Sequence, residues 1–116
     1  HPRRVATRFD PETEPVEHAA AWLHDTVEDC DILLEDLLDA GIPDRVVDVV
    51  HLLTRRPGIP EDDYYRAIRR DPAALRVKLA DIDDNTEPSR TALLDTATRE
   101  RLATKYAHAR EMLLGE

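Results

Sequence analysis

The stretch VEHAAAWLHDTVED, residues 16–29, sets the pattern for the whole chain. Its apolar residues recur at the spacings i, i+3, i+4, i+7 and i+11, which follow one face of an α-helix. They are Val16, Ala19, Ala20, Leu23 and Val27. The stretch therefore predicts an amphipathic helix with one buried face.

Breaker residues on both sides divide the rest of the chain into further helical segments. Gly41 suits the residue just after a helix, and Asp71 followed by Pro72 suits the start of one. No alternating apolar and polar pattern of a strand is present. Besides 16–29, the pattern predicts helices at 2–9, 32–40, 43–53, 61–70, 73–85 and 95–114. We expect an all-α, single-domain bundle of six or seven helices over residues 1–116.

Composition restricts the function further. The 116 residues suit one domain, and 25 acidic against 16 basic residues give a formal charge of −9. Such a chain is a poor match for nucleic acid, and it has no apolar run long enough to span a membrane. The single Cys30 excludes an internal disulfide and a paired-cysteine metal site. We expect a cytoplasmic protein with neither nucleic acid nor membrane as partner, and the oligomeric state stays open.

A cluster of ionisable residues lies at the end of the first stretch. At about 100° per residue, His24, Asp25, Glu28 and Asp29 share roughly 140° of one helix face, beside the apolar stripe. The carboxylates repel one another there, and a divalent cation among them would reverse that repulsion. Taken alone, such a cluster is more typical of a solvated helix face than of a metal site.

A second cluster lies on the segment 73–85. Lys78, Asp81 and Asn85 share a face with the core-type residues Leu75 and Ile82. Asp81 could complete a metal shell with His24 and Asp25, although spacing alone does not show that the two segments face each other. Taken alone, this group is more typical of a salt-bridged surface.

Both clusters belong to motifs of one known family. AAWLHDTVEDCD, residues 20–31, closely resembles the signature of the HD-domain metal-dependent phosphohydrolases, most of all the RelA/SpoT-type guanosine tetraphosphate hydrolases. VKLADIDDNT, residues 77–86, is similar to their second motif, and His1-Pro2 to their first His-Pro pair. The three motifs follow the family's order and cover most of the chain. The resemblance implies an all-helical bundle, in agreement with the periodicity.

The resemblance also implies a metal centre. It assigns one divalent ion, most simply Mn²⁺, to His1, His24, Asp25 and Asp81. Such a mixed nitrogen and oxygen shell suits Mn²⁺. Glu28 and Asp29 match the acidic pair that orients and activates the attacking water, while the ion polarises a phosphoryl oxygen.

Substrate contacts are expected from the same motif and from the last segment. Lys78 and Asn85 match substrate-contacting positions of the family, whereas Asp83 and Asp84 add charge that would repel a highly anionic substrate. Four further elements are candidates for phosphate and base contacts from their residue types alone, although solvated surface, or core for Tyr106, is an equal alternative. They are the loop at Arg55 and Arg56, Arg101, Lys105 and Tyr106.

The resemblance implies a nucleotide phosphohydrolase, most simply a guanosine-3′,5′-bis(diphosphate) 3′-pyrophosphohydrolase. One alternative is the same chemistry on another phosphorylated small molecule, because one fold hosts many substrates. A second alternative is a non-catalytic regulatory module with the HD fold. The sequence begins at His1, and the family pattern leads us to expect a further helix upstream of it.

Overall fold

The computed structural model describes residues 2–29, 34–55 and 57–115, and these residues form helices and no strand. The expected all-α class is therefore confirmed. The helices are α1 (Pro2–Ala6), α2 (Pro15–Asp29), α3 (Leu34–Asp39), α4 (Asp44–Leu53), α5 (Glu61–Arg69), α6 (Pro72–Asn85), α7 (Pro88–Thr91) and α8 (Thr96–Leu114). None of them is long and apolar enough to cross a membrane.

The described residues form eight helices, one more than the seven segments expected. The additional helix is α7, which lies between the expected segments 73–85 and 95–114, where Pro88 is one of the breaker residues. Proline breaks a helix in its interior but suits the first position, where its missing N–H would have no partner anyway. Pro88 takes that first position, so it begins a short helix and does not end one.

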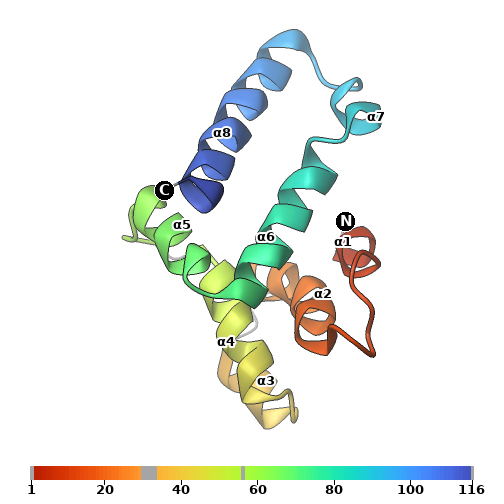
Figure 1. The fold of residues 1–116 in the computed structure, drawn as a ribbon, viewed down its shortest axis with the longest axis vertical. Coiled ribbons are helices and arrows are strands. Elements are labelled where there is room, and N and C mark those ends of the chain that lie inside the picture. The colour runs from red at the N-terminus through yellow and green to blue at the C-terminus, as the bar shows by residue number, and fades with distance from the viewer. Residues whose placement is uncertain (1, 30–33, 56, 116) are drawn as a thin grey trace.

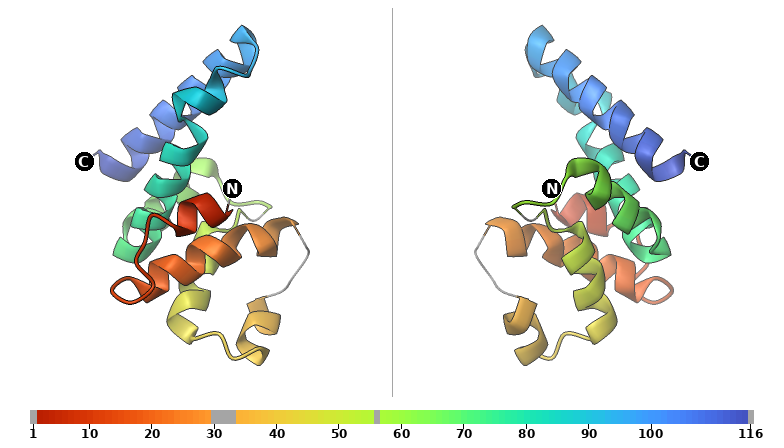
Figure 2. Two further views of the ribbon diagram at one scale, coloured as in Figure 1. Left: turned by 90° about the vertical axis from the view of Figure 1, so that its right-hand side faces the viewer. Right: turned by 90° about the vertical axis from the view of Figure 1, so that its left-hand side faces the viewer.

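One hydrophobic core joins the helices, and it is built around α2, α4 and α6 (Figure 1). α4 supplies a group of branched apolar residues to this core, all of them buried: Val46, Val47, Val49, Val50 and Leu53. The end of α6, α7 and the first part of α8 extend beyond this body, and α8 then returns to pack on α5 (Figures 1 and 2). The molecule is accordingly elongated, 44 × 29 × 29 Å.

Polar contacts fix α2 between its neighbours. The ring of His18 donates from Nδ1 to the carbonyl oxygens of Ala6 at 2.9 Å and Phe9 at 3.1 Å. On the other side, the buried carboxylate of Glu17 accepts from Arg76 of α6 at 2.9 Å. α1 and α6 are therefore held against the helix that carries His24.

We expect Asp71→Ala to lower the free energy of unfolding by roughly 1–2 kcal/mol. The Asp71 carboxylate caps α6 by accepting from the backbone N–H of Ala73 and Ala74, and it pairs with Arg45 of α4 at 2.6 Å. The substitution removes the cap and the ion pair together. Urea unfolding followed by circular dichroism measures the loss.

The Arg45 side chain, with help from the two capping N–H groups, lowers the pKa of Asp71 below its ordinary 3.8. A lowered folded-state pKa gives stability that is complete above the unfolded value and is lost as the pH falls through the folded value. The wild type and Asp71→Ala should therefore converge in strong acid. Arg45→Gln keeps the cap and should lose less than Asp71→Ala; equal losses would assign the whole effect to the ion pair.

Candidate functional site

Two of the expected site residues meet in space. His24 of α2 and Asp81 of α6 are both buried, and His24 Nε2 lies 3.8 Å from Asp81 Oδ1. The packing of α2 against α6 produces this approach. The structure therefore shows that α2 and α6 face each other at this point, which the spacing of residues in the sequence alone could not establish.

The backbone orients the His24 ring. Nδ1 lies 3.2 Å from the carbonyl oxygen of Ala21, and a carbonyl can only accept, so Nδ1 carries the proton. In the neutral ring, Nε2 then presents its lone pair toward Asp81. Metal-binding histidines are commonly held in this way, with the N–H of one ring nitrogen on a backbone carbonyl and the other nitrogen available as a ligand.

The Asp81 carboxylate lies between two partners. Its Oδ1 faces His24, and its Oδ2 lies 3.7 Å from Lys78 Nζ, one turn earlier on α6. Asp81 and Lys78 are both largely withdrawn from solvent, with side chains 11% and 18% exposed. A cation and a histidine therefore flank one buried carboxylate.

The other two expected metal ligands, His1 and the side chain of Asp25, lie outside the described residues. So do the side chains of the expected catalytic pair, Glu28 and Asp29, although α2 runs through positions 25, 28 and 29. Within the described part of the chain, no three His, Cys, Asp or Glu side chains gather where a metal could be held. Of the four expected metal ligands, the structure thus describes the side chains of two, His24 and Asp81.

A cavity of about 210 Å³ opens beside this pair. Its lining brings together α2, α5, α6, α8 and the residues at the end of α4. The lining residues are His24, Leu53, Arg55, Tyr64, Tyr65, Lys78, Asp81, Lys105 and Tyr106. Among the described lining residues there are three cations and one carboxylate, in a chain whose net charge is −9. This described part of the lining is therefore positively charged.

Each of the three described cations of the lining lies near a tyrosine ring. The guanidinium carbon of Arg55 is 4.9 Å and Lys78 Nζ is 5.4 Å from the ring centre of Tyr64. Lys105 Nζ is 5.4 Å from the ring centre of Tyr106. These distances fall within the range of cation–π attraction, about 6 Å. The rings thus help to hold the positive charges in place.

The hydroxyls of Tyr65 and Tyr106 stay neutral near physiological pH. Burial, with the charge of Glu61 beside it, raises the pKa of Tyr65 to about 12. Burial and the charge of Asp81 also raise the pKa of Tyr106. These hydroxyls can therefore serve as hydrogen-bonding groups and are poor proton acceptors.

Two of the expected substrate contacts are joined to each other, and a third lies elsewhere. Asn85 Nδ2 donates to the hydroxyl of Tyr106 at 3.3 Å, linking α6 to α8. Tyr106 lines the cavity. Arg101 is exposed on α8 and is not among the described residues that line the cavity, whereas Lys105, one turn later, is. The structure thus brings Lys78 and Tyr106 to the cavity and leaves Arg101 outside it.

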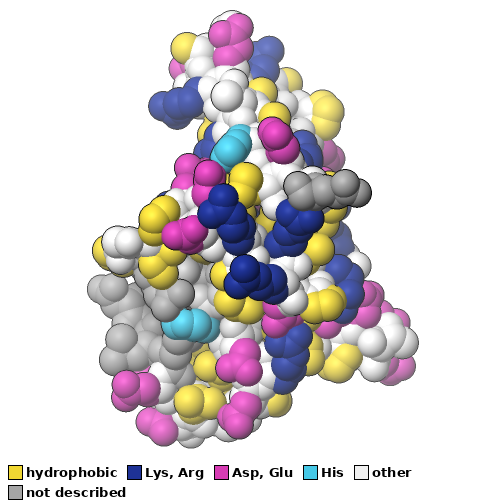
Figure 3. Space-filling view, turned by 60° about the vertical axis from the view of Figure 1, so that its left-hand side comes forward, with side chains coloured by type: hydrophobic (Ala, Val, Ile, Leu, Met, Phe, Trp, Pro, Cys, Tyr) yellow, Lys and Arg dark blue, Asp and Glu magenta, His cyan; other side chains and the backbone are white. Residues whose placement is uncertain are grey.

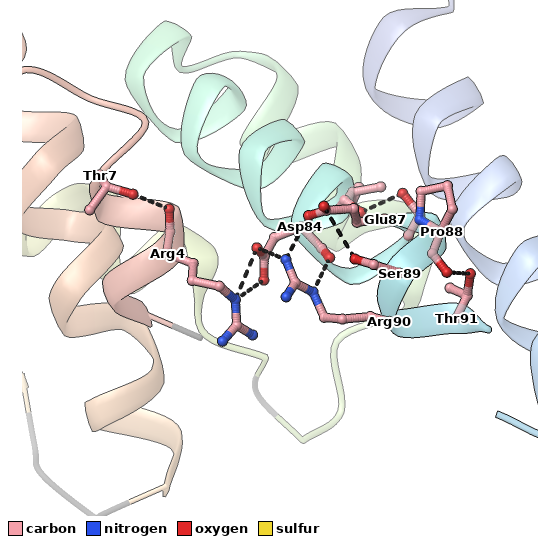
Figure 4. A network of polar contacts seen from close by, with 10 residues as sticks. Arg4, Thr7, Asp84, Glu87, Pro88, Ser89, Arg90 and Thr91 are labelled. Carbon is pink, nitrogen blue, oxygen red and sulfur yellow. Dashed lines mark hydrogen bonds and ion pairs between the residues drawn. The ribbon is translucent and has the colours of Figure 1, made fainter. Parts of the chain in front are cut away.

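Asp84, expected to repel an anionic substrate, is compensated by two arginines (Figure 4). Its carboxylate is buried and lies 3.2 Å from Arg4 of α1 and 2.6 Å from Arg90 of α7. Arg90 also donates to the Asp84 backbone carbonyl and to Glu87. This network ties α1 and α7 to the end of α6, one turn after Asp81.

A second cavity, of about 320 Å³, lies between α5 and the end of α8. Its described lining includes none of the expected site residues; it consists of Arg66, Arg69, Glu111, Met112 and Gly115. Lys and Arg side chains also gather in the middle of one face of the molecule, with acidic side chains around them (Figure 3). Positive charge is therefore not confined to the first cavity, and it is His24 and Asp81 that distinguish that one.

Sequence reasoning did not identify Tyr64 and Tyr65 as site residues. Both are buried on α5, a short helix with a strongly charged sequence. The sequence held one indication that they belong to the site: they are adjacent tyrosines among charged residues, and they follow a loop with two arginines. Their position next to Lys78 depends on how α5 packs on α6, which local spacing does not give.

No protein-family model matches the chain, and a search of curated proteins finds no significant match.

Proposed function

We propose that this chain is a metal-dependent phosphohydrolase that acts on a phosphorylated nucleotide, as the motifs shared with the HD-domain enzymes suggest. The observation that carries the proposal is the approach of His24 to Asp81 across α2 and α6. The two motifs stand far apart in the sequence, and each supplies one of these residues. Their meeting beside a basic cavity favours one common site.

The described donors fit a divalent ion. Two ligands that each lie about 2.1 Å from one ion can be at most about 4.2 Å apart. The 3.8 Å between His24 Nε2 and Asp81 Oδ1 satisfies this limit and is too long for a hydrogen bond. His24 and Asp81 would hold Mn²⁺ together with Asp25 and His1, and the bound ion would supply an activated water and Lewis acidity.

The cations of the cavity would bind the phosphate groups. Lys78 of α6 and Lys105 of α8 both line the cavity, Lys78 beside the carboxylate of Asp81 and Lys105 beside the ring of Tyr106. At about 210 Å³ the cavity is smaller than the roughly 300–1,000 Å³ that whole ligands of drug size occupy. It suits the phosphoryl end of a nucleotide, with the base outside it. Removal of the 3′-pyrophosphate of guanosine tetraphosphate is the simplest such reaction.

Phosphate or pyrophosphate release from a panel of nucleotides, including guanosine tetraphosphate, tests the proposal. We expect release from at least one nucleotide with Mn²⁺ present, loss of release with a chelator, and recovery when Mn²⁺ is added back. The reason is that the acidic and histidine ligands alone supply no Lewis acid.

Asp81→Asn, purified in parallel, controls for a contaminating phosphatase, because it keeps the size of the residue and removes its charge. Equal release by Asp81→Asn would assign the activity to a contaminant. If the panel yields no release at all, the alternative of a non-catalytic regulatory module with this fold is favoured.

A further inference from the structure

The long helix α8 forms one wall of the first cavity through Lys105 and Tyr106. Its apolar attachment to the body is confined to its second half. Within the described chain, the buried residues of α8 are Ala109 and Leu113, with Tyr106 and Met112 partly buried beside them. The first half of the helix projects past the body (Figures 1 and 2). A wall helix of 19 residues thus buries little of its surface.

Hydrogen bonds to the end of α6 supply further attachment. Arg110 donates to Asp83 Oδ1 at 3.0 Å and to the hydroxyl of Thr86 at 2.9 Å. One turn earlier on α8, the hydroxyl of Tyr106 accepts from Asn85 at 3.3 Å. Arg110 therefore joins α8 to two residues of the last turn of α6, next to the residue that holds Tyr106.

Water reaches the charged contacts of α8. The side chains of Arg110 and Asp83 are 39% and 55% exposed. Toward α5, His108 Nε2 lies 2.9 Å from Asp62 Oδ1, and both of these side chains are exposed as well. Exposed ion pairs contribute little to stability, because water solvates the partners once they separate. The attachment of α8 thus includes contacts that can open at small cost.

The chain that leads into α8 is held more firmly. Arg90 of α7 pairs with the buried carboxylate of Asp84 on α6 at 2.6 Å and donates to its backbone carbonyl at 2.9 Å. Residues 92–95 then connect α7 to α8, and Leu93 in this connection is 85% exposed. An exposed connection between a fixed helix and a weakly held one is a suitable place for a hinge.

We propose that α8 is a movable wall of the cavity, which swings about residues 92–95 and which Arg110 latches to the end of α6. Segments with few buried apolar contacts open at a lower free energy than the core, so α8 should leave the body while α4 and α6 stay folded. Lys105 and Tyr106 then move away with α8, and Lys78 stays on α6. This opening is independent of the proposed function, because it requires neither a metal nor a particular ligand.

Native-state hydrogen exchange of the full chain, without added metal or ligand, tests the opening. A detached helix of this length is marginal in water, so its amides exchange once it leaves the body. After correction for the exchange rates of an unfolded peptide, residues 105–113 should exchange at least about tenfold faster than the amides of α4. Equal protection of the two helices would show that α8 opens only when the whole domain unfolds, and would overturn the proposal.

Arg110→Gln tests the latch. It should accelerate exchange in α8 about three- to tenfold and leave α4 unchanged, because it removes bonds that exist only in the closed state. Arg101→Gln makes the same charge change on the same helix, where the arginine has no hydrogen bond or ion pair with another described helix, and should behave as the wild type does. Equal acceleration of α4 and α8 by Arg110→Gln would assign Arg110 to the stability of the whole fold and overturn the latch.

The partner residue on α6 gives an independent test of the latch. Asp83→Asn should accelerate exchange in α8 of the wild type but add little in the Arg110→Gln background, because both substitutions act on one contact. Fully additive effects would contradict a latch between these two residues.

Chemical labelling of the cavity shows whether α8 covers it. Lys78 and Lys105 are the two lysines of the chain. Lys78 lines the cavity with its side chain 18% exposed, whereas Lys105 is exposed on α8. Arg110→Gln should speed acetylation of Lys78 by an N-hydroxysuccinimide ester about threefold and leave Lys105 unchanged, as measured by mass spectrometry of peptides. An unchanged rate at Lys78 would show that α8 does not control access to the cavity, and would overturn the proposal.

Discussion

Replacing His24 by Ala is expected to remove bound Mn²⁺ and phosphohydrolase activity together. His24 Nε2 faces the buried Asp81 carboxylate at 3.8 Å, so the substitution deletes one of the two described donors. A metal ion contributes several kcal/mol to the transition state of phosphoryl transfer, which corresponds to at least about a 10³-fold loss in kcat/KM. Metal analysis and steady-state hydrolysis of the same samples measure both effects.

The same variant should lose the stabilisation that the ion confers. An ion present at 100 times its Kd stabilises the native state by about 2.7 kcal/mol, which for a chain of this length raises the Tm by roughly 10 °C. His24→Ala and Asp81→Asn should both lack this increase, and so should Asp25→Asn at the adjacent position. Asp62→Asn, an exposed carboxylate of α5, should keep it. An equal increase in all four variants would show that Mn²⁺ binds only to surface charge.

The fold was predictable because residues at the helix ends themselves determine where most of the helices begin and end. Asp71 and Pro72 mark the start of α6, and Gly41, with φ of 87°, follows α3 in the left-handed conformation that glycine favours. The run of valines in the expected helix 43–53 forms the buried face of α4. α7 was missed because Pro88 can act both as a breaker and as a good first residue of a helix; in the structure it is the first residue, and Arg90 of the same helix pairs with Asp84.

The site was predictable only in part, because its contacts join distant segments. The spacing on α2 and on α6 placed His24 and Asp81 on partly apolar faces, and the motifs then suggested that they meet. Nothing local could show that Asp84 is neutralised by Arg4, which stands 80 positions away. The place of Tyr64 beside Lys78 likewise depends on the packing of α5 against α6.

Glu28→Gln is expected to lower kcat by about 10²–10⁴-fold while metal content and KM change little. α2 continues without a break from His24 to Asp29, so position 28 comes one helical turn after the histidine that faces Asp81. The family resemblance gives Glu28 and Asp29 the task of orienting the attacking water and taking its proton. Glutamine keeps the shape of the side chain but cannot accept that proton. Steady-state kinetics on the nucleotide chosen by the release screen, with metal analysis alongside, measure the effect.

The contrast between Glu28→Gln and His24→Ala separates proton transfer from metal binding. Loss of Mn²⁺ in Glu28→Gln would make Glu28 a ligand, and near-normal turnover would remove it from the mechanism. The pH profile adds an independent test, since the acidic limb of kcat/KM reports the base of the free enzyme. If Glu28 is that base, the limb should flatten in Glu28→Gln and persist in Asp62→Asn, because an exposed carboxylate of α5 takes no part in the proton transfer.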